Sequence, residues 1–325
     1  MSDETLLPVL DVLADGGLHS GEAMAQRFGI SRAALAKRVD HLRDWGLDIS
    51  AVAGAGYRLA APLQRLDAAQ IRSALTGAAR NAQVRVLTST DSTNSQFLAA
   101  DAAGDPQVLF AEHQTAGRGR RGRAWVSPFG SNLYLSIAWT FPAWPPRLTA
   151  LPLAMAVALA RVLEAAGLPE VTIKWPNDLH LNGQKLAGIL METRGEAGGS
   201  CRVVVGVGLN AALSPTQAAA VTQPWTSLAA ELAARQRPVP TRNALAASLV
   251  SELIAALGHF GEHGFAPFAA EWKRRDALAN RPVHVDAKPA IDGIARGIDS
   301  DGGLLIDTDA GRQVVHAGDV SVRAV

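Results

Sequence analysis

Residues 171–178 read Val171-Thr-Ile-Lys-Trp-Pro-Asn-Asp178, an apolar strand that runs directly into a cluster of polar side chains. Open α/β sheets place their ligands at such strand ends. Other apolar runs of strand length lie on both sides of this one, at Val84–Thr88, Val108–Glu112, Leu133–Thr140, Leu186–Glu192 and Val203–Leu209. Because stretches of helical period alternate with these runs, residues 66–277 are predicted to form one mixed α/β domain.

Residues 1–62 are predicted to form a separate winged helix-turn-helix domain. Apolar residues at a period of 3.6 mark a first and a third helix, and Ser20 and Ser31 are placed to cap the second and the third. The apolar positions are Leu6, Leu7, Leu10 and Leu13 in the first helix and Leu35, Val39 and Leu42 in the third. Two strand-like runs within residues 48–59, around an uncharged Gly54-Ala-Gly56, predict a β-hairpin wing.

The C-terminal part of the chain changes to a period of two residues. Turn sequences at Asp301-Gly-Gly303 and Ala310-Gly311 separate the short apolar runs. Residues 278–325 are therefore predicted to form a small β-barrel domain.

Composition narrows the class of protein. With 325 residues, 48% of them hydrophobic and 19% charged, the chain is long enough for several domains and too apolar for extensive disorder. The net charge of +1 argues against a chain coated in nucleic acid, although a local basic patch remains compatible with it. The single cysteine, Cys201, is expected in a buried strand and fits a reducing compartment.

No segment of the sequence predicts membrane attachment. The N-terminus, residues 1–4, is acidic where a signal peptide is basic. The apolar stretch Leu148–Ala160 is too short to cross a bilayer and is expected as a buried helix. A cytoplasmic location is therefore expected.

The predicted third helix carries a basic exposed side, as the recognition helix of a helix-turn-helix does. The candidate DNA-binding residues are Ser31, Arg32, Ala33, Lys37 and Arg38. A solvated helix in a docking or dimerisation domain would have a similar pattern, and Asp40 and Asp44 dilute the positive face. Both interpretations stay open on the sequence alone, and sequence-specific binding would need a dimer to reach two half-sites.

The densest chemical pattern is Gln114-Thr-Ala-Gly-Arg-Gly-Arg-Arg-Gly-Arg123. Glycines let the backbone wrap closely around a ligand, and arginines neutralise phosphate through forked hydrogen bonds. The spacing Gly117-x-Gly119-x-x-Gly122 also matches a dinucleotide fingerprint, which we reject because Pro128 prevents the helix that must follow. We interpret the segment as an anion-binding loop and not as a merely solvated one.

Further polar groups lie at other predicted strand ends. Lys174 is suited to phosphate, and Asn177 and Asp178 to Mg²⁺, a water molecule or a nucleophile, although Pro-Asn-Asp is also ordinary turn chemistry. Lys185 enters an otherwise apolar strand, which is unfavourable unless it meets an anion. Residues 91–94, Asp-Ser-Thr-Asn, offer small groups for a neutral polar ligand, or simply cap a helix beginning near Gln96.

Two other classes of site find little support. His259-Phe-Gly-Glu-His263 matches an inverted zinc-protease motif, but the glycines at 258, 261 and 264 lead us to expect no regular ligand-bearing helix there. The sequence contains no Walker loop and no evident Ser-His-Asp set. The arginine-rich loop and the polar side chains at the predicted strand ends instead suit the condensation of a carboxylate with ATP. That reaction depends on positioning and charge neutralisation.

Together these motifs resemble the bifunctional biotin–protein ligases that also act as biotin operon repressors. The resemblance spans nearly the whole chain and keeps the order of the winged helix, residues 91–94, 117–123, 174–178 and 185–190, and the C-terminal domain. It implies an α+β, or mixed α/β, fold: a winged helix-turn-helix, a class II synthetase-like mixed sheet with helices, and a small SH3-like β-barrel.

The resemblance also implies an activity and its partners. Biotin and MgATP would give biotinyl-5′-AMP, and biotin would pass to one lysine of a biotin carboxyl carrier protein, a subunit of acetyl-CoA carboxylase. Biotinyl-AMP would also favour a homodimer that binds operator DNA. Mg²⁺ would enter with ATP, and no protein ligands to the metal are firmly implied.

Site residues carry over by motif. The implied catalytic residues are Lys185, Arg118, Arg120 and Asp178. The implied biotin-binding residues are Ser92, Thr93, Asn94, Gln114, Gly117, Arg118, Arg120 and Lys185. The implied ATP-binding residues are Arg120, Arg121, Arg123, Lys174, Asn177, Asn210 and Trp225.

Three alternatives remain. The chain could be a lipoate or octanoate ligase, a repressor that senses biotin without catalysis, or a ligase whose N-terminal domain contacts protein and not DNA. The arginine-rich loop argues against the first, and the set Lys174, Asn177, Asp178 and Lys185 argues against the second. The uncharged wing keeps the third open.

Overall fold

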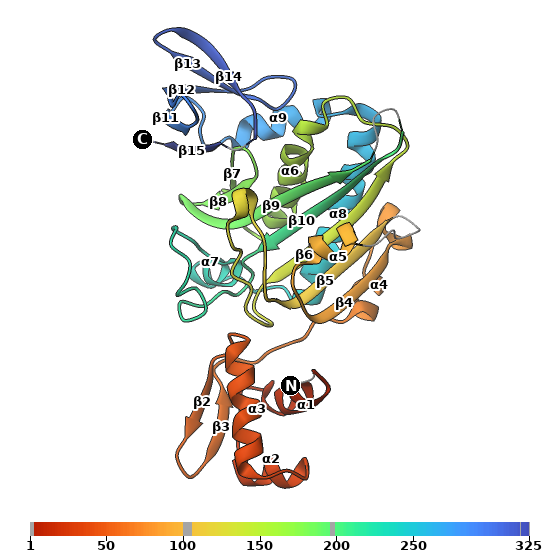
Figure 1. The fold of residues 1–325 in the computed structure, drawn as a ribbon, viewed down its shortest axis with the longest axis vertical. Coiled ribbons are helices and arrows are strands. Elements are labelled where there is room, and N and C mark those ends of the chain that lie inside the picture. The colour runs from red at the N-terminus through yellow and green to blue at the C-terminus, as the bar shows by residue number, and fades with distance from the viewer. Residues whose placement is uncertain (1–2, 100–105, 196–198, 319, 325) are drawn as a thin grey trace.

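The computed structural model describes residues 3–99, 106–195, 199–318 and 320–324. Met1 and Ser2, part of the acidic N-terminus, lie outside the described residues. The strands form three sheets of three, seven and five strands, which follow one another along the chain (Figure 1). The winged helix at one end, the mixed central sheet and the antiparallel C-terminal strands agree with the predicted fold class.

The N-terminal helices and wing form as their sequence patterns predict. The elements are α1 (Asp3–Leu13), β1 (Leu18–His19), α2 (Gly21–Arg27), α3 (Arg32–Asp44), β2 (Ile49–Val52) and β3 (Gly56–Leu59). Ser20 and Ser31 accept hydrogen bonds from the backbone N–H groups of Ala23 and Ala34, so both predicted caps are confirmed. The apolar stripe of α3 is buried. The two-residue strand β1, which pairs with β3, was too short for a periodic signal.

The central sheet has the strand order β4-β5-β6-β10-β9-β8-β7, and among its described strands only β4 and β5 run parallel. Its strands are β4 (Gln83–Thr90), β5 (Gln107–Gln114), β6 (Leu133–Phe141), β7 (Thr172–Lys174), β8 (Asp178–Leu181), β9 (Gln184–Arg194) and β10 (Cys201–Leu209). Every strand predicted in this range is present, and Cys201 is a buried strand residue.

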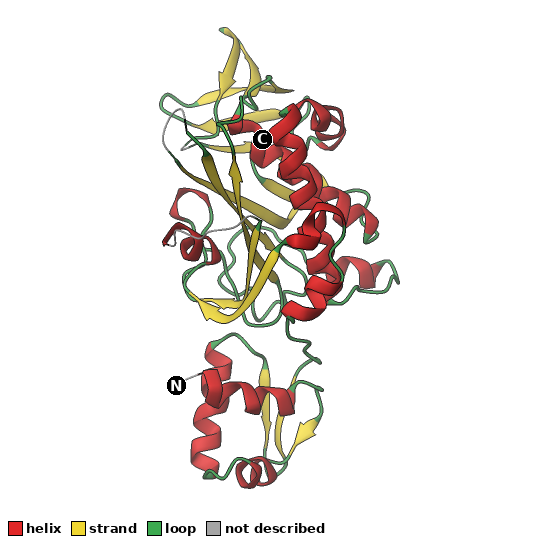
Figure 2. Cartoon of the chain, turned by 90° about the vertical axis from the view of Figure 1, so that its right-hand side faces the viewer, coloured by secondary structure: helices red, strands yellow, loops and turns green. Residues whose placement is uncertain are grey.

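Helices cover both faces of this sheet (Figure 2). The helices are α4 (Ala68–Ser73), α5 (Thr93–Ala99), α6 (Leu151–Ala165), α7 (Leu228–Ala234), α8 (Arg242–His263) and α9 (Ala266–Arg275), with 3₁₀ turns η1 (Gly77–Asn81), η2 (Arg120–Gly122) and η3 (Leu148–Ala150). Alternation along the strands decides which core a residue joins: Leu109 packs with Phe97 of α5, while its neighbour Phe110 joins the main core with α6 and α8.

Two helical stretches, Leu148–Ala165 and Arg242–His263, are long and apolar enough to span a bilayer. More than half of each is buried inside the protein, which accounts for the apolar composition without a membrane. The prediction of a buried helix for Leu148–Ala160 is confirmed as η3 and α6.

Two local predictions were wrong, and strand β8 was not predicted at all. The turn ends at Asn177, and Asp178 begins a strand that pairs back on β7. Helix α5 begins at Thr93 and not near Gln96, so residues 93 and 94 form its first turn. Helix α8 is regular through His263, despite its glycines. At Gly261 it packs closely on the Phe141 ring, from which a Cβ would lie only 3.0 Å away, so glycine permits this close packing.

The C-terminal sheet is antiparallel, in the order β14-β13-β12-β11-β15. Its strands are β11 (Pro282–Asp286), β12 (Ile291–Ile298), β13 (Leu304–Thr308), β14 (Gly311–Val315) and β15 (Ser321–Ala324). Trp175, which is 2% exposed, donates a hydrogen bond from its Nε1 to the carbonyl oxygen of Gly302 at 2.8 Å. This bond ties the turn between β7 and β8 to the C-terminal sheet.

The winged helix meets the central domain through an aromatic stack. Trp45, the residue that ends α3, stacks on Phe129 with ring centroids 5.1 Å apart and on His113 at 6.1 Å. The backbone N–H of Phe129 donates to the carbonyl oxygen of Trp45 at 2.8 Å. Burial lowers the pKa of His113 despite the opposing charge of Asp3, which favours a neutral imidazole in the stack.

Candidate functional site

An ion pair between two neighbouring strands forms the centre of the site. Lys185 Nζ lies 2.8 Å from Asp178 Oδ1, and the two side chains are 14% and 22% exposed. Asp178 is also paired across the β7–β8 hairpin with Lys174. The strand order β9-β8-β7 thus brings together three charged residues that are separated in sequence.

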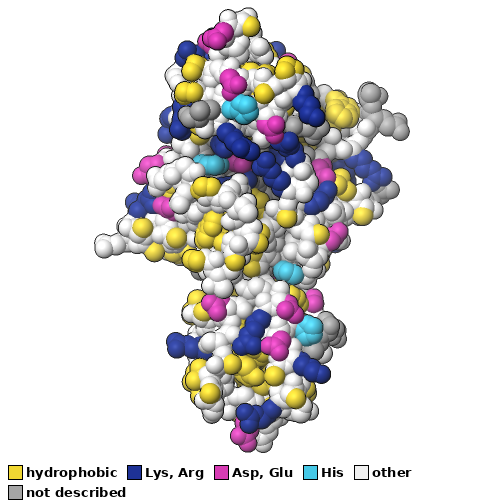
Figure 3. Space-filling view, turned by 60° about the vertical axis from the view of Figure 1, so that its left-hand side comes forward, with side chains coloured by type: hydrophobic (Ala, Val, Ile, Leu, Met, Phe, Trp, Pro, Cys, Tyr) yellow, Lys and Arg dark blue, Asp and Glu magenta, His cyan; other side chains and the backbone are white. Residues whose placement is uncertain are grey.

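Positive charge dominates around this pair. Burial lowers the pKa of Lys174, and the charges of Lys185, Arg123 and Arg323 lower it further, while Asp178 acts in the opposite direction. Figure 3 shows Lys and Arg side chains gathered where the C-terminal domain meets the central domain. An anion bound here would relieve the repulsion among these groups.

The indole ring of Trp125 packs against the Lys185 side chain. Lys185 Nζ lies 5.3 Å from the ring centroid, within cation–π range. A Cβ at Gly208 would lie 2.3 Å from the ring and one at Gly188 would lie 3.0 Å from it. Both strands therefore need glycine where Trp125 crosses them. This role of Trp125 was not predicted from the sequence, where the available signal was the pair of glycines in Gly206-Val-Gly208 within an otherwise apolar strand.

A set of neutral polar side chains, here called the polar wall, lies next to the cluster of Lys174, Asp178 and Lys185. It is formed by residues 92–94 with Gln114. Residues 92–94 are each no more than 4% exposed. The Ser136 hydroxyl lies 2.7 Å from Thr93 Oγ1 and 2.6 Å from Asn94 Oδ1. The backbone N–H of Thr93 donates to Gln114 Oε1 at 2.9 Å. The start of α5 and the end of β5 are thereby fixed to each other.

The loop after β5 closes on the same wall. Gln114 Nε2 donates to Ser127 Oγ at 3.0 Å, and the N–H of Trp125 donates to the carbonyl oxygen of Gly117 at 2.8 Å. A Cβ at Gly117 would lie 2.5 Å from the Trp125 carbonyl oxygen, so only glycine fits. Four of the predicted biotin-binding residues, Thr93, Asn94, Gln114 and Gly117, are thus joined in one hydrogen-bonded unit.

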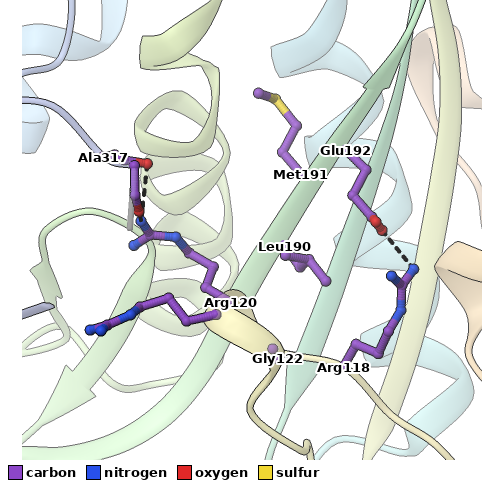
Figure 4. Close-up of a pocket in the computed structure, with 10 residues that line it drawn as sticks. Arg118, Arg120, Gly122, Leu190, Met191, Glu192 and Ala317 are labelled. Carbon is purple, nitrogen blue, oxygen red and sulfur yellow. Dashed lines mark hydrogen bonds and ion pairs between the residues drawn. The ribbon is translucent and has the colours of Figure 1, made fainter. Parts of the chain in front are cut away.

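The loop arginines point in different directions (Figure 4). Arg118 Nη2 lies 2.9 Å from Glu192 Oε2. Arg120 donates to the carbonyl oxygens of Ala317 at 3.0 Å and Gly318 at 2.7 Å, and reaches Asn177 Oδ1 at 3.4 Å. A pocket of about 410 Å³ lies among these residues.

Arg121 is held in the left-handed region, with φ 59°, and its guanidinium lies 3.4 Å from Asp286 of the C-terminal sheet. Gly122 follows with φ 69°. Such a backbone is unfavourable for a non-glycine residue and persists only where surrounding contacts fix it. The C-terminal domain therefore takes part in shaping the loop, which the sequence pattern did not reveal.

The remaining nucleotide candidates lie on the Lys185 side. Asn177 Nδ2 donates to the carbonyl oxygen of Ile189 at 2.6 Å, and Trp225 pairs with Lys185 as an isolated parallel bridge. Asn210 Nδ2 donates to the carbonyl oxygen of Thr226 at 3.1 Å and lies 3.4 Å from that of Lys185. The Asn210 amide thus holds the segment containing Trp225 against β9.

The DNA-binding candidates lie apart from the pocket, on α3. Ser31, Arg32, Ala33 and Lys37 are exposed and Arg38 is half-buried. The neighbouring Arg43 is instead engaged by Asp40 and by the carbonyl oxygen of Ile49. The available positive charge therefore concentrates toward the N-terminal half of the helix.

A metal centre finds no support within the described ranges. These residues contain no group of three or more His, Cys, Asp and Glu side chains placed to hold an ion. The rings of His259 and His263 pack edge to face at 4.8 Å on the regular helix α8. Our sequence argument against that motif assumed an irregular helix, and this reason was wrong.

A cationic cluster beside a neutral polar wall and an arginine-lined pocket, in a chain that also carries a winged helix, defines an anion-binding domain joined to a domain of the DNA-binding type. Family models match all three parts of the chain: an HTH domain at residues 6–58, the biotin/lipoate A/B protein ligase family at 84–210, and the biotin protein ligase C terminal domain at 279–323.

Known proteins match all or most of the chain. The bifunctional ligase/repressor BirA of Escherichia coli is 41% identical over 330 residues, which covers 100% of this chain and 99% of the relative. The biotin–[acetyl-CoA-carboxylase] ligase of Mycobacterium tuberculosis is 36% identical over 266 residues, or 78% and 95% of the two chains. The structure of a biotin protein ligase from Aquifex aeolicus in complex with biotin and ATP matches with a TM-score of 0.64 and 25% identity, over 75% of this chain and 99% of that one. The chain belongs to the biotin protein ligase family.

Proposed function

We propose that this protein joins biotin to ATP, forming biotinyl-5′-AMP and pyrophosphate, and then transfers biotin to a lysine of a biotin carboxyl carrier protein. The observation that carries the proposal is the Lys174–Asp178–Lys185 cluster, which lies beside the arginine loop on adjoining strands. The division into residues 1–62, 66–277 and 278–325 is proposed with it. Biotin is favoured over lipoate because relatives that cover 78% and 72% of this chain are named biotin–[acetyl-CoA-carboxylase] ligases, and because residues 279–323 match the biotin protein ligase C terminal domain.

In the first step the biotin carboxylate attacks the α-phosphorus of ATP. A P–O bond forms to the carboxylate oxygen and the P–O bond to pyrophosphate breaks, so no protein nucleophile is needed. Lys185 offsets the charge of both anions as they approach, and Lys174 stabilises the triphosphate together with Arg120, Arg121 and Arg123. The head group is held at the polar wall by Ser92, Thr93, Asn94, Gln114 and Arg118.

In the second step a neutral lysine amine of the carrier attacks the acyl carbon, and AMP leaves. Asp178 is placed beside Lys185, where the acyl phosphate would lie, and serves to orient the amine or take its proton. Mg²⁺ would arrive with ATP and neutralise phosphate charge. Phosphate and water oxygens would supply most of its ligands, with Asn177 as the neighbouring side-chain oxygen, since Asp178 is already paired.

The winged helix supports a second activity, repression of biotin genes by a homodimer with bound biotinyl-AMP. The exposed Arg32 and Lys37 are suited to phosphate and base edges. We infer a cytoplasmic protein, since its carrier and its DNA would both be found there.

Purified protein, biotin, MgATP and folded apo carrier protein are expected to yield a carrier heavier by one biotin. Intact-mass spectrometry measures this product, and reactions without ATP serve as the control. A carrier that stays unmodified would contradict the ligase function.

DNA from upstream of a biotin gene is expected to retain the protein only when biotinyl-AMP is present. A mobility-shift titration at fixed salt measures this, because phosphate contacts make affinity strongly salt-dependent. Equal retention on scrambled DNA would count against repression and favour a protein-contacting role for the winged helix.

Arg120→Ala is expected to release biotinyl-AMP before transfer, because it removes the side chain that links the loop to Asn177 and to the segment between β14 and β15. Mass spectrometry should then find biotin on bystander lysines of an added unrelated protein. The Arg27→Ala variant, which changes a distant arginine on α2, is the control. Strict carrier specificity in Arg120→Ala would refute this role of the loop.

A further inference from the structure

We propose that Glu192 is a positioning residue of the biotin pocket, whose carboxylate holds both Arg118 of the loop and Asn94 of α5. The inference rests on the proposed function, since it assigns these two residues to the biotin end of the site. Nothing in the sequence pattern singled out Glu192, which lies near the end of strand β9.

One carboxylate oxygen makes both contacts. Glu192 Oε2 accepts from Asn94 Nδ2 at 2.8 Å and from Arg118 Nη2 at 2.9 Å. Glu192 is 25% exposed and Arg118 is 40% exposed, so the ion pair lies at the rim of the pocket (Figure 4). Three segments, α5, the loop and β9, therefore meet at a single atom.

Asn94 has little freedom to move away from this carboxylate. Its Oδ1 lies 2.6 Å from the Ser136 hydroxyl, and its Nδ2 also lies 3.2 Å from the carbonyl oxygen of Leu190. The side chain rests directly on Gly206, where a Cβ would lie 2.3 Å from Oδ1. The Glu192 carboxylate thus links Asn94, whose side chain is held in place, to Arg118, which is more exposed.

This arrangement divides charge along the pocket. Lys174, Lys185 and Asp178 leave the nucleotide end cationic, while Glu192 neutralises Arg118 at the polar wall. A neutral head group then meets fixed hydrogen-bonding groups without an excess charge beside it. Arg118 is also ordered before the ligand arrives, so binding does not have to immobilise it.

The test is Glu192→Gln in the full-length protein, assayed by biotin-dependent exchange of pyrophosphate into ATP. We expect the KM for biotin to rise by about tenfold, while the KM for MgATP and kcat change less than about twofold, because the loss is one of pre-ordering. Glu262→Gln, an exposed carboxylate on α8, is the matched control and should leave all three unchanged. An unchanged biotin KM in Glu192→Gln would overturn the proposal.

A double-variant cycle separates positioning from general stability. Glutamine keeps an oxygen that can accept from Asn94 but loses the charge that pairs with Arg118, so Glu192→Gln tests the Arg118 contact. Adding Glu192→Gln to Arg118→Ala should therefore raise the biotin KM by less than about twofold. The same tenfold effect in both backgrounds would overturn the proposal. Should Glu192→Gln fail to fold, Glu192→Asp is measured instead, since the shorter side chain cannot reach both partners, and an unchanged biotin KM would again overturn it. Absence of exchange in the unaltered protein would contradict the ligase function and not this role.

Discussion

Replacing Lys185 with alanine is expected to slow biotinyl-adenylate formation by about a thousandfold. Lys185 Nζ lies between Asp178, at 2.8 Å, and the Trp125 ring, at 5.3 Å from its centroid. Its removal takes away the cation nearest the place where two anions must meet. It also leaves the Asp178 carboxylate without this counter-charge, so that it repels the incoming carboxylate and phosphate.

The measurement is pyrophosphate exchange at saturating biotin and MgATP, so that a loss in kcat is seen apart from weaker binding. Lys273→Ala, at an exposed position on α9, is the control and should keep full activity. Thermal unfolding of both variants establishes that each is folded. A folded Lys185→Ala protein that retains more than about a tenth of the exchange rate would contradict the role given to Lys185.

Gly208→Ala is expected to reduce kcat/KM for biotin by about a hundredfold. The new methyl group would lie 2.3 to 2.6 Å from three atoms of the Trp125 indole, and a rigid ring cannot relieve such overlap by bending. Trp125 must shift, and Lys185, which lies against its ring, must shift with it. The indole ring and the ammonium group of Lys185 are then both displaced from the site.

Gly258→Ala provides the control for Gly208→Ala. A Cβ at Gly258, within helix α8, meets nothing within 4 Å, so this change should be neutral or slightly stabilising. Measuring kcat/KM for both variants compares the same chemical change in a crowded and an open position. Wild-type kinetics in Gly208→Ala would show that Trp125 does not shape the site.

Local patterns in the sequence predicted much of the fold. The stripe Leu35, Val39 and Leu42 and the cap Ser31 specify α3 without help from distant residues, and the apolar runs specify the central strands. Predictions failed where a distant partner decides the outcome. Helix α8 stays regular at Gly261, where it packs on Phe141, and β8 exists because β7 and β9 flank it.

The residues of the site also fall into two groups, those that a local sequence pattern predicted and those that depend on distant contacts. Lys174 and Lys185 stood out in sequence because charged residues at apolar strand ends are unusual, and the structure places them around Asp178. Their companions could not be found this way. Glu192 is an ordinary residue near a strand end until Arg118 folds against it, and Trp125 looks like any core residue until two glycines make room for its ring.

The stack of Trp45 on Phe129 connects the end of helix α3 to the segment that borders the polar wall. Phe129 lies two residues after Ser127, which holds Gln114 at the polar wall. Helix α3 has 13 residues and is therefore about 20 Å long. Pivoting the helix by about 10° at Trp45 would carry its far tip, with Arg32, through roughly 3 Å, a distance comparable to the spacing of one base pair. A small shift at Trp45 would thus become a larger displacement at Arg32, one of the candidate DNA-binding residues.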